Sequence, residues 1–222
     1  MLDKKIRVGI IDLGINNIHS IVNAFKKIKC KVNIISKKEN LLKYNIVILP
    51  GVGAFKTAIK KLADLKIENE IIKFVENNPK NYLVGICLGM QLLFNESYEF
   101  GHSKGLGLIE GKVLPFDKKI CKIIPHMNWN TISIKNNKKI FKKFSKKNFY
   151  FVHSYFCKPK NSNEIIAQTN HNGYKFCSIV KKENIIGLQF HPEKSSLIGI
   201  DLLKNITKLI WLRNLTLDYL KK

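Results

Sequence analysis

A cysteine stands in a sequence pattern that exposes and activates a thiol. Cys87 is the centre of Gly85-Ile-Cys87-Leu-Gly89, after the apolar run Tyr82–Ile86 and before apolar residues at helical spacing up to Phe94. A strand that turns sharply into a helix at such a segment presents the thiol at a helix N-terminus, where unpaired N–H groups favour thiolate. So tight a turn needs residues without side chains on both sides. We therefore predict that Cys87 is a nucleophile.

A base and an acid that could serve this thiol lie much further along the chain. His191 follows the apolar run Ile185–Phe190, and Glu193 comes after the intervening Pro192. A strand end can bring the imidazole to the same sheet edge as Cys87, while the carboxylate orients the ring, in the roles of nucleophile, base and orienter. Such general-base assistance is worth roughly 10²–10⁴ in rate. Polar surroundings predict solvated positions for three other histidines: His19, His102 and His171.

A glycine loop provides the third element of a catalytic site. Gly51, Val52 and Gly53 follow Pro50, directly after the apolar run Ile46–Leu49. Two glycines let backbone N–H groups face a site, as an oxyanion hole requires, and losing one such donor typically costs about 10²–10³ in rate. Alone, this pattern is more often a plain turn. Beside the other two elements it supports an acyl-transfer site.

The elements that must position these residues follow the rhythm of a parallel sheet covered by helices on both faces. Short β-branched runs alternate with helical spacing in the first half of the chain, and Asp64 is a possible break in the second helix. The expected elements are Arg7–Leu13, Asn17–Ile28, Lys31–Ile35, Ile46–Leu49, Thr57–Asn78 and Tyr82–Ile86.

The second half predicts antiparallel strands that extend the sheet or form a side layer. Its short apolar runs are Ile120–Ile124, Thr131–Ile134, Phe149–Val152, Ile165–Thr169, Phe176–Val180 and Ile185–Phe190, and Ile200–Tyr219 is the closing amphipathic helix. We therefore expect an α/β fold with a mostly parallel central sheet, flanking helices and an antiparallel extension. No linker or repeat divides the chain, so residues 1–222 are expected to form one domain.

Composition restricts the partners. The net charge of +23 comes almost entirely from dispersed lysines, with Arg7 and Arg213 as arginines, which argues against specific nucleic-acid binding and for a compositional bias. Five cysteines without a CxxC pair predict no metal site and a reduced, cytoplasmic setting. No apolar stretch suits a membrane span or a signal peptide. An inert core role suits Cys30, Cys121 and Cys177.

Three motifs together resemble the class I glutamine amidotransferases: Gly-Ile-Cys-Leu-Gly-Met-Gln, Gln-Phe-His-Pro-Glu and Pro-Gly-Val-Gly-Ala-Phe. Within that family the chain is similar to the glutaminase subunits of imidazole glycerol phosphate synthase. The narrower likeness rests on Pro125-His126-Met127-Asn128-Trp129-Asn130, on Phe149–Tyr155, and on Lys104-Gly-Leu-Gly-Leu-Ile. It covers the chain from Val8 to the closing helix. Asn128 departs from the glycine usual at that position.

The resemblance implies that Cys87 forms a glutamyl thioester, that His191 moves the protons and that Glu193 orients the imidazole. It implies a heterodimer with a (βα)₈-barrel cyclase that receives the ammonia for histidine synthesis, and no cofactor. The implied glutamine-binding residues are Gln91, Glu99, His153, Ser154 and Tyr155; the implied oxyanion loop is Gly51, Val52 and Gly53; and the implied docking residues are His126, Trp129 and Asn130.

Other functions stay open at this point. Paralogues of these subunits supply ammonia for surface-sugar amination, and an inactive scaffold would keep the same fold. A cysteine peptidase on a similar sheet would work without a synthase, but it would not explain the Pro-His-x-x-Trp-Asn segment. The charge suggests a nucleic-acid binder, and loss of binding at moderate salt would reduce that to a nonspecific effect.

Overall fold

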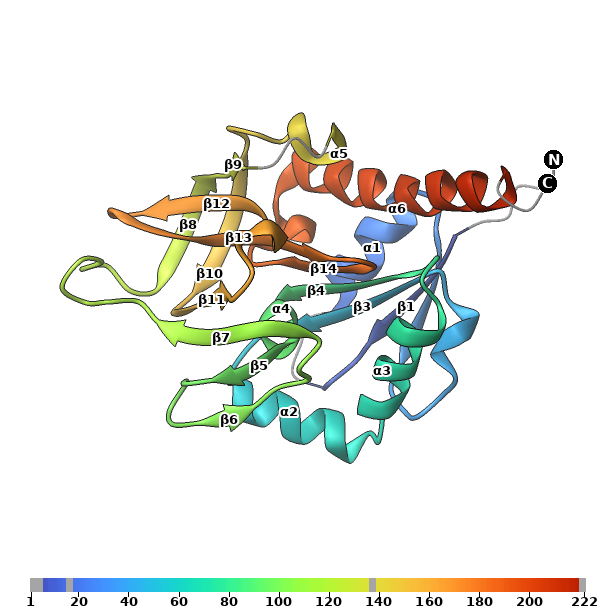
Figure 1. The fold of residues 1–222 in the computed structure, drawn as a ribbon, viewed down its shortest axis with the longest axis horizontal. Helices are drawn as coiled ribbons and strands as arrows, with labels where there is room; N and C mark the ends of the chain where they lie inside the picture. Colours follow the sequence, from blue (N-terminus) through green and yellow to red (C-terminus); the bar gives the residue numbers. More distant parts are fainter. Residues whose placement is uncertain (1–5, 15–17, 136–138, 220–222) are drawn as a thin grey trace.

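The computed structural model describes residues 6–14, 18–135 and 139–219, and within them an eight-stranded sheet runs through the molecule (Figure 1). The neighbouring parallel strands are β2 (Lys31–Ile35), β1 (Arg7–Ile11), β3 (Ile46–Gly51), β4 (Tyr82–Cys87) and β14 (Ile185–Leu188). The sheet continues through antiparallel β13 (Tyr174–Lys182), β12 (Ile165–His171) and β9 (Ser133–Ile134). The predicted fold class is confirmed.

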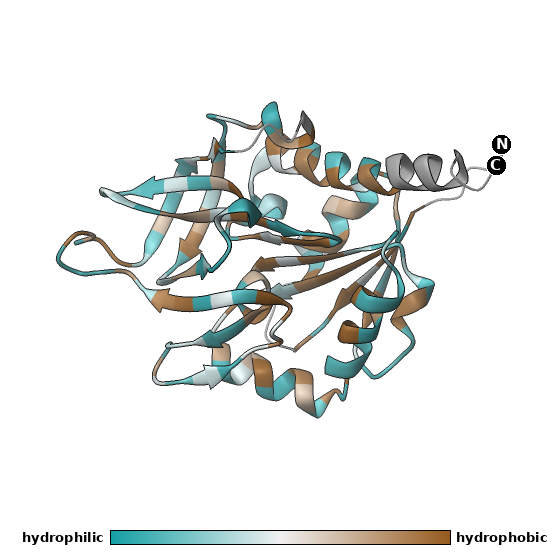
Figure 2. Ribbon diagram, viewed as in Figure 1, coloured by the Kyte–Doolittle hydropathy of each residue, from teal (hydrophilic) through white to brown (hydrophobic). Residues whose placement is uncertain are grey.

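Helices bury both faces of the parallel strands, as the apolar runs require. Every residue of β3 and β4 is buried, which is the pattern of strands covered on both sides. One core lies beneath α1 (Ile18–Lys27) and α6 (Ser196–Tyr219), and a second beneath α2 (Phe55–Asp64) and α3 (Glu68–Asn77). Figure 2 shows the apolar residues gathered on the central strands and on the inward sides of these helices.

The predicted break near Asp64 is confirmed. The helix α2 ends at Asp64, and Lys66 takes a positive φ of 53° before α3 begins at Glu68. The chain therefore turns between two helices on one face of the sheet.

Two smaller sheets form the side layer over the carboxyl end of the central strands. The first has the order β11-β7-β5-β6, and β10 pairs with β8 in the second. Their bounds are β5 (Phe94–Ser97), β6 (Ser103–Lys104), β7 (Ile109–Pro115), β8 (His126–Thr131), β10 (Asn148–His153) and β11 (Tyr155–Pro159). The remaining elements are η1 (Leu41–Lys43), α4 (Leu88–Leu92), α5 (Lys139–Lys142), η2 (Ser162–Glu164) and η3 (Pro192–Lys194).

Two expectations for this layer were wrong, and two of its strands were not predicted. The helix after Cys87 ends at Leu92, because Phe94 enters β5, which pairs in parallel with the unpredicted β7. The strand β11 was not predicted either, since its residues alternate too weakly. The run Ile120–Ile124 forms a turn, closed by N–H groups of Ile120 and Cys121 donating to the carbonyl of Asp117, 3.1 and 2.8 Å away.

No helix within the described ranges combines the length and the hydropathy that crossing a bilayer requires.

Candidate active site

Cys87 occupies a strained backbone position between β4 and α4. Its φ and ψ are 55° and −111°, outside the regions that L-residues ordinarily adopt. A Cβ on Gly85 would lie 2.6 Å from the carbonyl oxygen of Gly89, and one on Gly89 would lie 1.7 Å from that of Leu49. Both flanking glycines are therefore sterically obligatory, as the sequence predicted. The turn directs the thiol out of the strand at the start of the helix.

His191 and Glu193 approach this thiol from the neighbouring strand. The parallel strands β4 and β14 are in register, with Ile86 opposite Leu188, so their ends meet at the same sheet edge. His191 Nδ1 lies 2.7 Å from Glu193 Oε1, and both side chains are only 3% exposed. A carboxylate only accepts, so Nδ1 donates and Nε2 is left for proton exchange with the sulfur.

A serine that the sequence argument missed holds the backbone of His191. Ser195 Oγ donates to the carbonyl of His191 at 2.6 Å and accepts the N–H of Tyr150 at 3.0 Å. The N–H of His191 in turn donates to the carbonyl of Tyr150 at 2.9 Å. These bonds fix the backbone of His191, while Glu193 holds the ring. The only sequence signal for Ser195 is a small hydroxyl residue directly after the His-Pro-Glu-Lys segment.

The electrostatics of this pair favour a charged imidazole. Burial acts to lower the pKa of His191, but the neighbouring sulfur of Cys87 and the carboxylate of Glu193 outweigh it and raise the pKa to about 10. The thiol of Cys87 donates to the carbonyl of Val152 at 3.6 Å, and His191 Nε2 makes no hydrogen bond to any described residue. The sulfur of Cys87 nevertheless lies close enough to the ring to raise the pKa of His191.

Other cysteines lack this environment. Burial raises the pKa of Cys30 to about 11, and it also raises the pKa values of Cys157 and Cys177. Such thiols stay protonated and unreactive at neutral pH. The expected inert role of Cys30 and Cys177 agrees with this.

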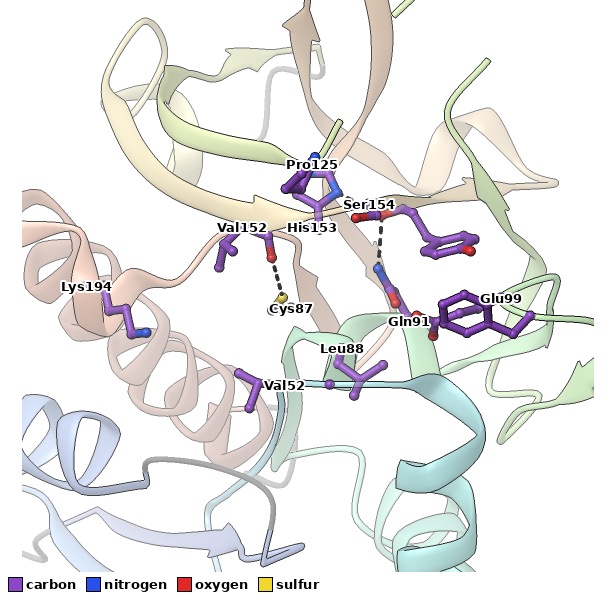
Figure 3. Close-up of a pocket in the computed structure, with 13 residues that line it drawn as sticks. Val52, Cys87, Leu88, Gln91, Glu99, Pro125, Val152, His153, Ser154 and Lys194 are labelled. Atoms are coloured by element: carbon purple, nitrogen blue, oxygen red, sulfur yellow. Dashed lines mark hydrogen bonds between the residues drawn. The ribbon is translucent and has the colours of Figure 1, made fainter. Parts of the chain in front are cut away.

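The predicted glutamine-binding residues line one cavity of about 640 Å³ in front of the thiol (Figure 3). The side-chain amide of Gln91, on α4, donates to the carbonyl of Tyr155 at 3.0 Å. Further lining residues that the sequence argument did not name are Leu88, Phe100, Pro125, Val152 and Lys194. The predicted lining residues are Val52, Gly53, Gln91, Glu99, His153, Ser154 and Tyr155.

Glu99 brings a carboxylate to this cavity. Its Oε2 accepts the N–H of Phe55, the first residue of α2, at 2.6 Å. Burial raises the pKa of Glu99, and the hydrogen bond from Phe55 opposes that rise. A partly buried carboxylate fixed at a cavity wall suits a cationic group of a ligand. No set of three or more His, Cys, Asp or Glu within the described ranges is grouped so that it could hold a metal ion.

The predicted oxyanion loop borders the same cavity. Gly51 ends β3 opposite Cys87, and a Cβ there would lie 2.7 Å from the Cβ of Leu88. Val52 and Gly53 line the cavity, and Gly53 takes a φ of 92°, which strains any other residue. Gly51 thus lets the loop pack against Leu88, next to the nucleophile, and Gly53 provides the positive φ of its turn.

The predicted docking residues differ in exposure. Trp129 and Met127 on β8 are 46% and 59% exposed, and the indole lies edge-on to Tyr150 with ring centroids 6.1 Å apart. Asn130 is half-buried. His126 has no exposed surface, so the prediction that it contacts a partner was wrong. Alternation along the strand explains this, because His126 faces the interior while Met127 faces outward.

A strained cysteine, a buried His–Glu pair and a cavity lined by the polar side chains of Gln91, Glu99 and Ser154 are the features of a cysteine amidohydrolase on an α/β sheet. The family model "Glutamine amidotransferase class-I" matches residues 9–207. Imidazole glycerol phosphate synthase subunit HisH of Wolinella succinogenes is 38% identical over 206 residues, covering 91% of this chain and 99% of its own. The HisH of Helicobacter hepaticus is 40% identical over 219 residues, covering 92% and 99%.

Among solved structures, PurLQS from Thermotoga maritima superposes with a TM-score of 0.72 at 22% identity, covering 97% of this chain and 99% of the other. The likeness at this identity shows the shared fold. The chain belongs to the class I glutamine amidotransferases and, within them, to the HisH family of imidazole glycerol phosphate synthase subunits. The resemblance found in the motifs is confirmed.

Proposed function

We propose that this chain is the glutaminase subunit of an imidazole glycerol phosphate synthase: it hydrolyses L-glutamine and passes the ammonia to a cyclase subunit for histidine synthesis. One observation carries the proposal. The buried pair of His191 and Glu193, joined at 2.7 Å, acts on Cys87, and Cys87 lines the same cavity as Gln91 and Glu99. The HisH relatives support the pathway, since their names place them in that synthase.

The reaction uses two proton transfers at one imidazole. The proton of Cys87 moves to Nε2 of His191 before the attack, which gives the thiolate and the charged imidazole that the raised pKa of His191 favours. The sulfur then attacks the amide carbon of glutamine, and Nε2 protonates the departing nitrogen as ammonia. Water attacks the resulting thioester, gives a proton to Nε2, and the proton returns to the sulfur as glutamate leaves. Glu193 keeps the other ring nitrogen protonated throughout, so Nε2 always faces the sulfur.

Substrate orientation comes from the walls of the cavity. The carboxylate of Glu99 suits the α-ammonium group of glutamine, and Gln91, His153, Ser154 and Tyr155 line the path from there to the thiol. N–H groups of the loop at Gly51, Val52 and Gly53 are proposed to stabilise the oxyanion of the tetrahedral intermediates.

Ammonia requires a sheltered exit, because in water it becomes ammonium, which has no lone pair to attack with. Met127 and Trp129 are exposed on β8, and β8 pairs with β10. On β10, the carbonyl of Tyr150 accepts the N–H of His191. A partner seated on that face lies one strand away from the catalytic histidine. We propose that a (βα)₈-barrel cyclase docks there, with Trp129 and Asn130 at the contact.

Two further proposals follow from the sequence. Residues 1–222 are proposed to form one domain, since the family match spans residues 9–207 without interruption. A reducing, cytoplasmic setting is proposed, which the five free cysteines support.

Glutamate and imidazole glycerol phosphate production by the chain with the cyclase of the same organism tests the function. Cys87→Ala and Cys87→Ser should abolish glutamate formation and leave complex formation intact, whereas Cys30→Ser, a control at a half-buried thiol, should retain activity. Glutamate formation by Cys87→Ala would refute the nucleophile. Glutamate formation without imidazole glycerol phosphate would assign the chain to another amination.

A further inference from the structure

Three histidines form a buried cluster that the catalytic mechanism does not use. His126 on β8 stacks on His171 at the end of β12, with ring centroids 4.0 Å apart and planes 24° apart. His126 Nδ1 also lies 3.1 Å from Nε2 of His153, on β10. The prediction that His171 is solvated was therefore wrong: it is 8% exposed. The cluster packs against the rings of Phe116, Phe151 and Phe176.

The hydrogen bonds of this cluster have one direction only. His153 Nδ1 lies 2.8 Å from the carbonyl oxygen of Tyr155, which can only accept, so Nδ1 carries the proton. A neutral His153 then accepts at Nε2, and His126 Nδ1 must donate to it. His126 Nε2 is left as an acceptor, and the amide nitrogen of Asn130 donates to it at 3.3 Å. Four groups thus form a hydrogen-bonded relay from Asn130 through His126 and His153 to the carbonyl of Tyr155.

Burial keeps the two histidines of this relay neutral, and so each of its hydrogen bonds keeps one donor and one acceptor. It lowers the pKa of both His126 and His153 to about 3, with neighbouring histidines adding to the effect. Both rings are therefore uncharged at physiological pH, each with one donor and one acceptor. The amide of Asn130 also donates to the carbonyl of Asn170 at 2.8 Å, which fixes the orientation of the amide group.

The two ends of this hydrogen-bonded relay, Asn130 and the carbonyl of Tyr155, lie at functionally different places. Asn130 belongs to the strand whose outward face carries Trp129. The carbonyl of Tyr155 accepts from both His153 and the side-chain amide of Gln91, and all three residues line the cavity in front of Cys87. The dashed line at the side chain of Gln91 in Figure 3 marks this hydrogen bond. A shift of β8 therefore changes the hydrogen bond that places a wall of the cavity.

We propose that His126 is a positioning residue: through His153 it sets the Tyr155 carbonyl against which Gln91 rests, and through Asn130 it couples the glutamine cavity to the docking strand β8. The inference rests on the proposed function, since it takes the cavity to bind glutamine. His126 itself touches neither glutamine nor a partner. Coupling of this kind is reciprocal, so glutamine in the cavity would also favour the position of β8 that suits the partner.

The test is glutamine affinity by calorimetry on the full chain carrying Cys87→Ala, which prevents turnover. In that background, His126→Phe keeps a stacked ring and removes the two hydrogen bonds that His126 makes, to Asn130 and to His153. His171→Phe is the matched control, because it is an equally buried ring on the other side of His126, and its Nε2 bonds the carbonyl of Ile123 instead. Asn130→Ala is a third variant at a half-buried position, and it leaves Nε2 of His126 without the donor that Asn130 supplies.

We expect His126→Phe to weaken glutamine binding about tenfold and Asn130→Ala about threefold, as loss of one or two net hydrogen bonds implies, while His171→Phe changes it less than about twofold. In the active background the same variants should raise KM for glutamine more than they lower kcat. Equal effects of His126→Phe and His171→Phe would overturn the proposal, since that is the result of a merely structural role. If His126→Phe does not fold, an unchanged affinity in Asn130→Ala overturns it.

Failure of the inference and failure of the proposed function give different results. A chain with Cys87→Ala that binds no glutamine, alone or with the cyclase, contradicts the proposed function and the inference with it. Glutamine binding that is indifferent to Asn130→Ala and His126→Phe contradicts the inference alone.

Discussion

His191 Nδ1 and Glu193 Oε1 lie 2.7 Å apart in a region where both side chains are 3% exposed, two residues from each other in the chain. Pro192 between them begins the short helix η3, which folds the carboxylate back onto the ring. The pair therefore depends on a local turn rather than on distant packing. A conservative substitution of Glu193 should therefore change the pair without disturbing the fold.

Glu193→Gln should lower kcat roughly 10²–10⁴-fold with little change in KM, because a neutral amide no longer fixes the tautomer or stabilises the imidazolium. It should also lower the pKa of His191, since the carboxylate is one cause of the rise to about 10. The rate of Cys87 alkylation against pH reports this shift. A profile identical to that of the wild type would contradict the assigned role.

The same pair predicts a stability difference with a defined pH window. A histidine whose folded pKa of about 10 exceeds its ordinary 6.5 stabilises the fold fully below pH 6.5, and this contribution is lost as pH rises toward 10. Urea unfolding should therefore show Glu193→Gln less stable than the wild type at neutral pH, with a difference that shrinks toward pH 10. A difference that grows with pH would show that the ring is held neutral.

The buried histidine pair predicts acid sensitivity of the opposite sign. Burial holds the pKa values of His126 and His153 at about 3, so the unfolded chain binds protons there that the folded chain does not. Stability should fall as pH drops below about 6.5, by up to about 1.4 kcal/mol per pH unit for each histidine. In urea unfolding between pH 7.5 and 5, His126→Phe should show a shallower decline than the wild type; an unchanged slope would mean that other groups cause it.

Gly53→Ala should reduce kcat tenfold or more while leaving the triad intact, because φ of 92° is strained for alanine and the oxyanion loop would shift. Gly173→Ala, at a φ of 86° in the turn between β12 and β13, is a control for the same backbone strain away from the site. Steady-state glutaminase rates of both variants with the cyclase give the comparison. Similar losses in the two would point to general destabilisation.

Trp129→Ala should weaken association with the cyclase about 30-fold, the effect of removing an aromatic hot spot at the centre of an interface. The indole is nearly half exposed and rests on Tyr150, so its loss removes contact area without opening the core. Ile34→Ala, at a 48% exposed residue on β2 at the far edge of the central sheet, is a control. Analytical ultracentrifugation or surface plasmon resonance measures both. Unchanged affinity in Trp129→Ala would move the docking face elsewhere.

The parallel half of the fold and the triad could be predicted because each depends on local pattern. The strands before Cys87 and His191 are continuous apolar runs, and parallel pairing brings their ends together. The glycines on both sides of Cys87 predict the tight turn that the structure contains. Once the order of the strands is known, the distance between Cys87 and His191 along the sequence does not affect the prediction that they meet.

The side layer could not be predicted because its determinants are non-local. Gly105 lies against β5, where a Cβ would lie 2.2 Å from the carbonyl oxygen of Phe94, and the sequence does not reveal this close approach. His171 lies in a polar stretch, yet its ring is buried by β8 and β12 coming together. Ser195 acts only through the backbone of His191 and Tyr150.

The most direct test of the central claim is affinity labelling of the chain, with the cyclase present, by a glutamine analogue whose side-chain amide is replaced by a chloroketone. Peptide mass spectrometry should find one adduct, on Cys87 rather than on the other four cysteines, and excess glutamine should prevent it. Glu193→Gln should slow the labelling. Equal labelling of several cysteines, or labelling of Cys87 that glutamine does not slow, would contradict a glutamine site built around this thiol.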